Sequence, residues 1–428
     1  MTYKEKGIQN LKETNEIYDN LLPLFSEDWE KIDASGKGDM TPFYFSEDMT
    51  AAVIDNRKPY ATLKKYMFQT EIVPGKTYEI NVPFEEYETP GQNVVYGILT
   101  LKNKEAKMTR RMYLDRKKSG HLSFIFQSEE EVAVLLELGI KREGKVIWYR
   151  PILRECDPIK PRKVRLASVY LGFKTVNFPY EENLKHIEEC FDRAAAEGVD
   201  LVGFSEDANT TWTDNLQAYE TLDGPFCTLM KRKAKEHSCY AFFSLHELDE
   251  HGCKKNTAVL VDRNGELVGT CSKSHLTLGE YEKGLVPGNG YPVFETDFGK
   301  IGMLVCWDSY FPETSRAMAF QGAELLLIST AGNPHFRHVA IAKENGVYVL
   351  VSCRYGKIKP EEGVAPTKII SPCGEILAQC NTDGEAAKAE IDLNDSGTIH
   401  YLSLGNADAY PHNVYMHEWR DDLYGAIK

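Results

Sequence analysis

The chain has 428 residues and a formal net charge of −14, from 64 acidic and 50 basic side chains. This excess of negative charge argues against a general surface for nucleic acid or another polyanion. The ten cysteines show no paired CxxC spacing, so neither a zinc ribbon nor a thioredoxin-like motif is indicated. The polar start MTYKEKGIQN and the lack of a long apolar run predict a soluble, cytoplasmic protein in a reducing compartment, with no membrane contact.

Residues 1–160 are predicted to form an all-β accessory domain. Apolar and polar residues alternate with a period of two in segments such as KTYEINVPFEEY and HLSFIFQS, which is typical of half-buried strands. Turn pairs such as Pro74-Gly75 and Pro90-Gly91 separate these segments, and only residues 7–25 have a helical period. The pattern indicates an antiparallel β-sandwich.

The order of these segments resembles the jelly-roll modules that many enzymes carry for binding sugars. The resemblance implies a jelly-roll-like sandwich and makes a carbohydrate the candidate ligand of this domain. The aromatic residues that would stack on a sugar ring are Tyr60, Tyr87, Tyr113 and Trp148. Aromatic residues in strands also pack in cores and across strands, so ligand binding and structural packing both stay open.

A second domain is predicted to cover residues 161–428. The linker at residues 156–164 contains two prolines and three basic residues, which indicates a domain boundary at about residue 160. Beyond it, apolar strands alternate with helical segments, and hairpins between them predict an α/β fold with mixed sheets and helices outside. The expected strands lie at 164–171, 199–206, 239–248, 323–330 and 347–353, the helices at 181–198, 225–238, 313–322 and 335–346, and the hairpins at 256–276, 292–306 and 368–380.

Three reactive residues stand at the ends of predicted strands in this second domain. Cys306 follows the apolar run 301–305 and precedes a helix that begins near Pro312. Glu206 ends the strand VDLVGFSE, and Lys273 closes a hairpin strand in TCSKSHL. Alone, each residue would be interpreted as a small buried thiol or a surface charge. Together they predict a reaction centre in one crevice.

The segments DLVGFSE, SKSHL and GKIGMLVCWDSYFPE resemble, in this order, those that carry the catalytic residues of the nitrilase superfamily of carbon-nitrogen hydrolases. Further matches are PGNGYPVFETDFGKIG, RAMAFQGAELLL and ISPCGEIL. One departure is Ser205, at a position before the glutamate where the family usually has proline. The resemblance implies a four-layer α-β-β-α sandwich for this domain and a homodimer.

By this resemblance, Cys306 is the nucleophile and Glu206 the general base, while Lys273 and the backbone N–H of Trp307 stabilise the oxyanion. A thiol at its ordinary pKa is only slightly ionised near pH 7, which is why the nucleophile needs a base. Attack on the substrate gives a thioester and releases ammonia or an amine, and water then yields a carboxylic acid. This chemistry requires neither a metal nor a cofactor.

The family also has a second glutamate between the lysine and the cysteine. Glu280 and Glu282 both fall in this segment, LTLGEYEKG, and Glu280 is favoured because the Gly-Glu pair occurs in similar relatives. Trp307, Asn333 and His335 are the expected substrate-binding residues. For His335, a place on the surface of a helix is the alternative.

The motif CWD at residues 306–308 is more similar to the amidase and carbamoyl-amine hydrolase branches than to true nitrilases, which commonly carry Cys-Trp-Glu. The expected substrate is therefore a small linear amide or N-carbamoyl compound. Its identity stays open because variable loops shape such pockets. Two alternatives remain, an acyltransferase that uses the same thioester with another acceptor, and a binding protein whose active site has been retired.

Overall fold

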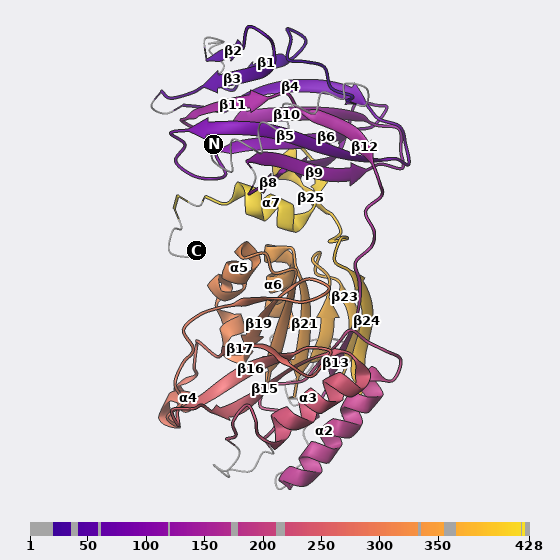
Figure 1. Ribbon diagram of the computed structural model, residues 1–428, viewed down its shortest axis with the longest axis vertical. Helices are drawn as coiled ribbons and strands as arrows, with labels where there is room; N and C mark the ends of the chain where they lie inside the picture. Colours follow the sequence, from indigo (N-terminus) through magenta and orange to yellow (C-terminus); the bar gives the residue numbers. More distant parts are fainter. Residues whose placement is uncertain are drawn as a thin grey trace. The chain divides into compact units, whose positions relative to one another are not determined.

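The computed structural model describes residues 20–35, 42–58, 61–118, 120–172, 179–210, 219–332, 335–354, 365–420 and 422–423. The chain forms two compact units (Figure 1), unit 1 with Met1–Lys160 and Thr398–Ala426, and unit 2 with Pro161–Gly397 and Ile427–Lys428. A helix was expected at residues 7–25. Residues 7–19 of this range lie outside the described residues, and residues 20–25 form no helix. None of the helices in the described ranges is both long and apolar enough to span a membrane.

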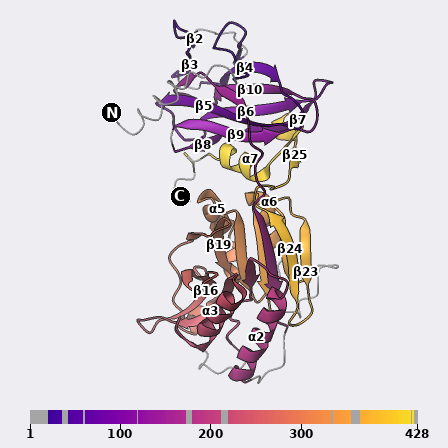
Figure 2. The same ribbon diagram turned by 45° about the vertical axis from the view of Figure 1, so that its right-hand side comes forward.

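Unit 1 consists of two β-sheets that share one core (Figure 2). Neighbouring strands pair antiparallel, except for a short parallel contact between β7 and β26. The first sheet has the order β1 (Glu30–Asp33), β4 (Lys64–Glu71), β10 (Ala133–Ile140), β6 (Val95–Lys102), β7 (Met108–Tyr113), β26 (Ala407–Ala409) and β25 (Ile399–Tyr401). The second has β2 (Phe43–Phe45), β3 (Ala51–Asp55), β11 (Lys145–Tyr149), β5 (Thr77–Tyr87), β9 (His121–Gln127) and β8 (Asp115–Lys117), with β12 (Ile152–Cys156) also paired to β5.

The alternating sequence pattern explains the core of unit 1. On β5, Tyr78, Ile80 and Val82 are buried, and the residues between them are more exposed, because successive side chains of a strand point to opposite faces. Tyr66 on β4 and Trp148 on β11 join them in the same cluster. The antiparallel sandwich predicted from the alternation is present, whereas the resemblance to jelly-roll modules stays a prediction.

Two of the four aromatic residues considered for sugar stacking are core residues. Trp148 is fully buried with its ring 5.6 Å from that of Phe84, and Tyr113 is buried and donates a hydrogen bond from its hydroxyl to Glu418 Oε1 at 2.9 Å. For these two, the packing interpretation is correct. Tyr87 is 46% exposed, and Tyr60 lies outside the described residues.

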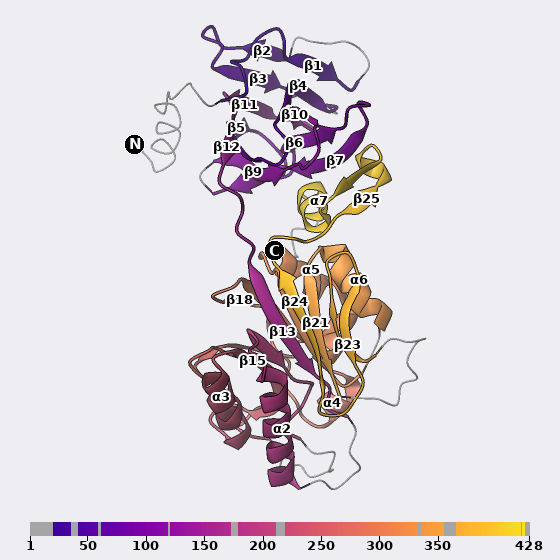
Figure 3. The same cartoon turned by 90° about the vertical axis from the view of Figure 1, so that its right-hand side faces the viewer.

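The end of the chain belongs to unit 1, although the second domain was expected to extend to residue 428. Besides β25 and β26, this tail contains the short 3-10 helix η3 (Leu402–Leu404) and helix α7 (Pro411–Glu418), drawn in yellow in Figure 3. Asn413 on α7 accepts a hydrogen bond from the backbone N–H of Tyr113 at 2.7 Å and donates one to its carbonyl at 2.9 Å. These buried bonds and the pairing of β26 with β7 attach the tail to the sandwich.

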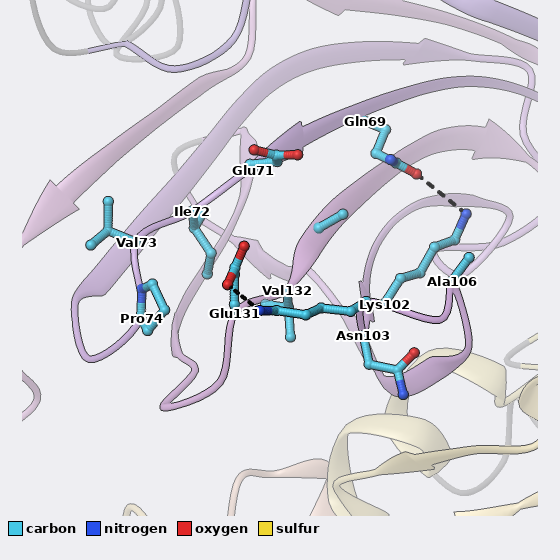
Figure 4. Close-up of a pocket in the computed structure, with 12 residues that line it drawn as sticks. Gln69, Glu71, Ile72, Val73, Pro74, Lys102, Asn103, Ala106, Glu131 and Val132 are labelled. Carbon is cyan, nitrogen blue, oxygen red and sulfur yellow. Dashed lines mark hydrogen bonds and ion pairs between the residues drawn. The ribbon is translucent and has the colours of Figure 1, made fainter.

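Unit 1 has a shallow hollow of about 390 Å³ between the β4–β5 turn and the β6–β7 loop (Figure 4). Lys102 Nζ donates to Gln69 Oε1 at 3.4 Å, and Lys104 pairs with Glu131 at 2.7 Å across it. The described residues that line it include no aromatic ring. This hollow therefore offers no aromatic ring on which a sugar could stack, and a carbohydrate ligand for this domain stays a prediction.

Unit 2 contains two mixed sheets of six strands each. The β14 sheet has the order β17 (Leu267–Ser272), β16 (Lys254–Val261), β15 (Tyr240–Leu248), β14 (Leu201–Gly203), β13 (Lys163–Val169) and β24 (Ala386–Asp392). The β19 sheet has β18 (Val293–Glu295), β19 (Lys300–Val305), β20 (Leu325–Thr330), β21 (Tyr348–Cys353), β22 (Thr367–Ile370) and β23 (Ile376–Cys380). The central strands of each sheet are parallel and the outer ones antiparallel, so the predicted hairpins are present.

The two sheets of unit 2 face each other and carry helices on their outer sides. One apolar cluster lies between the sheets, and a second joins the β14 sheet to α2 (Tyr180–Ala195) and α3 (Pro225–His237). On the other side, α5 (Pro312–Phe320) contacts β19 and α6 (His335–Asn345) contacts β21. The layers run helix, sheet, sheet, helix, which is the four-layer arrangement expected for this domain.

Local sequence determines where these elements begin and end. On α2, Ile187, Cys190, Phe191 and Ala194 recur at helical spacing and are buried against the β14 sheet. The chain leaves this helix at Gly198, whose φ of +71° is easily adopted only by glycine. Strand β20 is buried along its whole length, as expected for a central strand covered on both faces.

Candidate active site

Glu206, Lys273 and Cys306 all lie just beyond strand ends of unit 2. Glu206 follows β14, Lys273 follows β17, and Cys306 follows β19. Because β17 runs antiparallel to β16, and β16 antiparallel to β15, strands β17 and β14 run in the same direction and end at the same sheet edge. This topology brings Glu206 and Lys273 together, and the thiol of Cys306, which belongs to the other sheet, is close enough for both charges to affect its pKa.

Cys306 occupies a strained backbone position at the junction of β19 and the 3-10 helix η2 (Cys306–Tyr310). Its φ is +44°, a region that non-glycine residues enter at a cost of roughly 1–3 kcal/mol. The hydroxyl of Ser309 donates to the carbonyl of Cys306 at 2.6 Å and closes the turn. The thiol lies near the end of the neighbouring strand β20, where hydrogen bonds with Thr330 and Ala331 act on its pKa.

The thiol of Cys306 is held in its neutral form. Burial raises the pKa of this thiol to about 12, and the negative charge of Glu206 adds to the effect, while Lys273 partly opposes it. At pH 7 almost no thiolate is present. The thiol therefore requires a base at the moment it attacks an electrophile.

Lys273 is the centre of a buried polar cluster and only 2% exposed. Its ammonium donates to Glu206 Oε1 at 3.0 Å and to Glu280 Oε1 at 2.8 Å. Burial disfavours the ammonium, but the surrounding negative charges, that of Glu206 first, outweigh burial and raise the pKa of Lys273. A cation shared by two carboxylates remains protonated and keeps its third hydrogen available for another acceptor.

Asn256 is a member of this cluster that the sequence did not reveal. It lies on β16, is almost fully buried, and donates through Nδ2 to Glu206 Oε1 at 2.8 Å and to Glu280 Oε1 at 3.1 Å. The backbone N–H of Ala331 donates to the other Glu206 oxygen at 2.8 Å. The sequence offered only a weak signal, because Asn256 belongs to the polar first half of the strand KKNTAVLV, at the sheet edge where Glu206 lies.

Glu280, and not Glu282, reaches the cluster. Both lie on the short helix α4 (Leu278–Glu282), where Thr277 and Glu280 form a capping box. One Glu280 oxygen accepts from the Thr277 N–H at 2.7 Å, which leaves the other directed at Lys273. Burial works against its charge, but Lys273 outweighs burial and lowers the pKa of Glu280. Glu282 is exposed.

The predicted substrate-binding residues are described only in part. Trp307 is 37% exposed, with its ring 4.3 Å from that of Tyr310. Asn333 lies outside the described residues, and His335 begins α6 with a side chain that is not described. Within the ranges that the structure describes, no group of three or more His, Cys, Asp or Glu residues is arranged to hold a metal ion.

The four-layer sandwich carries a buried Glu-Lys pair whose charges act on the thiol of Cys306, and the sequence comparisons identify the family to which this chain belongs. Residues 165–401 match the family model described as carbon-nitrogen hydrolase, which covers more than half of the chain. The chain belongs to this family, within the nitrilase superfamily, and is a hydrolase.

Individual relatives support the same membership. Citrullinase of Francisella tularensis is 30% identical over 293 residues, which cover 62% of this chain and 98% of the relative. N-carbamoylputrescine amidase of Arabidopsis thaliana is 34% identical over 196 residues, 40% of this chain and 65% of that enzyme. Among solved structures, the NitFhit protein of C. elegans has a TM-score of 0.50 at 21% identity, over 61% of this chain and 66% of that chain, and this likeness shows the fold alone.

Proposed function

We propose that this protein hydrolyses a linear amide or N-carbamoyl compound through a thioester on Cys306. The observation that carries the proposal is the cluster in which Lys273 and Asn256 hold the carboxylates of Glu206 and Glu280 beside a neutral thiol. The amidase and citrullinase names of the relatives support a carbon-nitrogen bond of this kind.

In the first half-reaction, Glu206 removes the thiol proton as Cys306 Sγ bonds to the carbonyl carbon. The carbonyl oxygen becomes an oxyanion that accepts hydrogen bonds from Lys273 and from the backbone N–H of Trp307. Glu206 then gives its proton to the departing nitrogen, the C–N bond breaks, and ammonia or an amine leaves. The acyl group remains on sulfur as a thioester.

In the second half-reaction, a carboxylate of the cluster takes a proton from water, and the water oxygen adds to the thioester carbon. The C–S bond breaks, the thiol recovers a proton, and the acid is released. Glu280 positions the substrate and Lys273, since one of its oxygens accepts from Thr277 and the other from Lys273.

A screen of amides and N-carbamoyl compounds tests this proposal, with release of ammonia or amine measured for the wild type and for Cys306→Ala. The wild type is expected to turn over at least one compound and the variant none, with an unchanged circular dichroism spectrum. Turnover retained in Cys306→Ala would exclude the thioester. Transfer of the acyl group to an added amine without net hydrolysis would favour the acyltransferase, and an inert wild type would favour a retired site.

A further inference from the structure

Two basic residues, His246 on β15 and Lys254 on β16, lie on the same sheet face as the catalytic cluster. β15 and β16 are neighbouring strands (Figure 1) and pair antiparallel, and their register places His246 directly opposite Asn256. Residues opposite each other in such a pair project from the same face, and residues two apart on one strand do so as well. Because the Asn256 side chain binds Glu206 and Glu280, this is the face that the catalytic cluster occupies.

Both basic side chains contact the ring of Tyr219. Tyr219 stacks on the imidazole of His246, with centroids 4.8 Å apart and planes inclined by 16°. The ammonium of Lys254 lies 5.1 Å from the centroid of the same ring, within the range of a cation–π contact. The His246 side chain is 23% exposed, so the assembly is partly open to solvent.

The acidic group beside these residues is shared. His246 Nε2 lies 3.2 Å from Asp207 Oδ2, and the guanidinium of Arg354 lies 3.9 Å from the same oxygen. Burial works against a charge on His246, but the attraction of Asp207 outweighs burial and raises the pKa of His246, which favours the imidazolium form. Lys254 has no acidic partner within ion-pair distance among the described residues.

The neighbouring carboxylates are engaged elsewhere. Glu220, next to Tyr219, accepts from the backbone N–H of Phe226 in the first turn of α3 at 3.0 Å. Glu247, next to His246, accepts from the Thr257 hydroxyl at 2.5 Å and projects from the other face of the sheet. Among the described residues, the basic groups identified at this edge are Lys254, His246, Arg354 and Lys273, and the carboxylates are Asp207, Glu206 and Glu280.

We propose that His246 and Lys254 bind a carboxylate carried by the substrate, so that the preferred amide or carbamoyl substrate is an acid. A carboxylate accepts charge-assisted hydrogen bonds from an ammonium and an imidazolium. A neutral analogue gives the Lys254 ammonium no acceptor and leaves His246 with Asp207 alone, which is why such a site disfavours it. This inference rests on the proposed function, because it places the scissile carbon at Cys306.

The test compares monoamides of dicarboxylic acids, from malonic to adipic acid, each with its neutral methyl ester. For the pair that the wild type hydrolyses fastest, kcat/KM for the acid is expected to be at least tenfold higher than for the ester. Lys254→Met and His246→Gln should each lower kcat/KM for that acid about tenfold and leave the ester within twofold, because only the acid loses a partner. Lys255→Met is the matched control, since Lys255 projects from the opposite face and pairs with Asp249 at 2.8 Å.

Equal turnover of acids and esters, or an equal loss of both in the two variants, would overturn the subsite. If the wild type hydrolyses neither, the same pairs are titrated into Cys306→Ala by calorimetry. Tighter binding of acids that is lost in Lys254→Met then supports the subsite, and equal or absent binding overturns it. Cys306-dependent hydrolysis of neutral amides alone would keep the proposed function and reject this inference.

Discussion

Glu206 affects the thiol of Cys306 in two opposite ways. At rest, burial raises the pKa of the thiol and the negative charge of Glu206 raises it further. In the proposed reaction, the same carboxylate accepts the thiol proton. Glu206→Gln should therefore lower the thiol pKa and speed alkylation of Cys306 by iodoacetamide at pH 8 several-fold, while amide hydrolysis falls about a hundredfold or more.

Peptide mass spectrometry of the alkylated protein measures this at each cysteine. Cys271 is the internal control, because burial alone is the main cause of its raised pKa, which is about 12. Its alkylation rate should not change. A slower alkylation of Cys306 in Glu206→Gln would contradict the electrostatic account of the resting thiol.

Glu280 is expected to make stability depend on pH in the acid range. Burial opposes its charge, but Lys273 lowers the pKa of Glu280 below the value of 4.5 that applies to the unfolded chain. The folded protein therefore binds fewer protons at this site than the unfolded chain, so its contribution is complete above pH 4.5 and is lost as the pH falls through the folded-state pKa. In Glu280→Gln, the free energy of unfolding from urea titrations between pH 3 and 7 should fall less steeply on the acid side. An unchanged slope would show that the Lys273 pair does not set this pKa.

The residues of the candidate site differ in how far the sequence predicts them. Glu206, Lys273 and Cys306 stand in ordered segments that resemble a family, and each follows an apolar strand. Asn256 has no such motif, since its role depends on the pairing of β16 with β15 and on the position of α4. The choice between Glu280 and Glu282 likewise depends on the capping box, which fixes the direction of the Glu280 side chain. That contact is visible only in the three-dimensional structure.

At the level of elements, the turn between β19 and η2 is the strained part of the site. With φ at +44°, the backbone of Cys306 is in a region that glycine enters at little cost. Cys306→Gly is therefore expected to be more stable than Cys306→Ala by about 1 kcal/mol, the reverse of the usual order. At Cys271, within the regular strand β17, alanine should be the more stable of the two replacements. Thermal or urea unfolding of the four variants measures this, and the usual order at both positions would mean that the turn relaxes.

Elements with a strong local pattern were predicted, and those that depend on distant contacts were not. The helix expected at residues 181–198 is α2, because its apolar residues recur at helical spacing before a glycine. The short strands β25 and β26 have three residues each, and β26 pairs with β7, far earlier in the chain. Periodicity in so short a segment carries little information, so the sequence assigned this tail to the wrong unit.

At the scale of the whole molecule, each unit has its own apolar clusters. In the described residues, unit 1 has one cluster in the sandwich and one between the sandwich and the tail, and unit 2 has two around the β14 sheet. Such units are expected to keep separate stabilities. The homodimer, the cytoplasmic location and a sugar ligand stay predictions from the sequence. The tail offers a direct test of separate stability, because it is distant in sequence from the rest of unit 1 and is held there by identified bonds.

Asn413→Ala is expected to weaken unit 1 and leave unit 2 unchanged. The substitution removes two buried hydrogen bonds to the backbone of Tyr113, and each unsatisfied group costs roughly 1–3 kcal/mol. Hydrogen exchange should therefore accelerate at the amides of β7 and not at those of β20, which lies in unit 2. Leu402→Ala is the control within the tail, because Leu402 is 82% exposed and its truncation should change stability by less than about 0.5 kcal/mol. Equal acceleration in β7 and β20 would mean that the two units unfold together, and no acceleration in β7 would mean that the tail does not stabilise the sandwich.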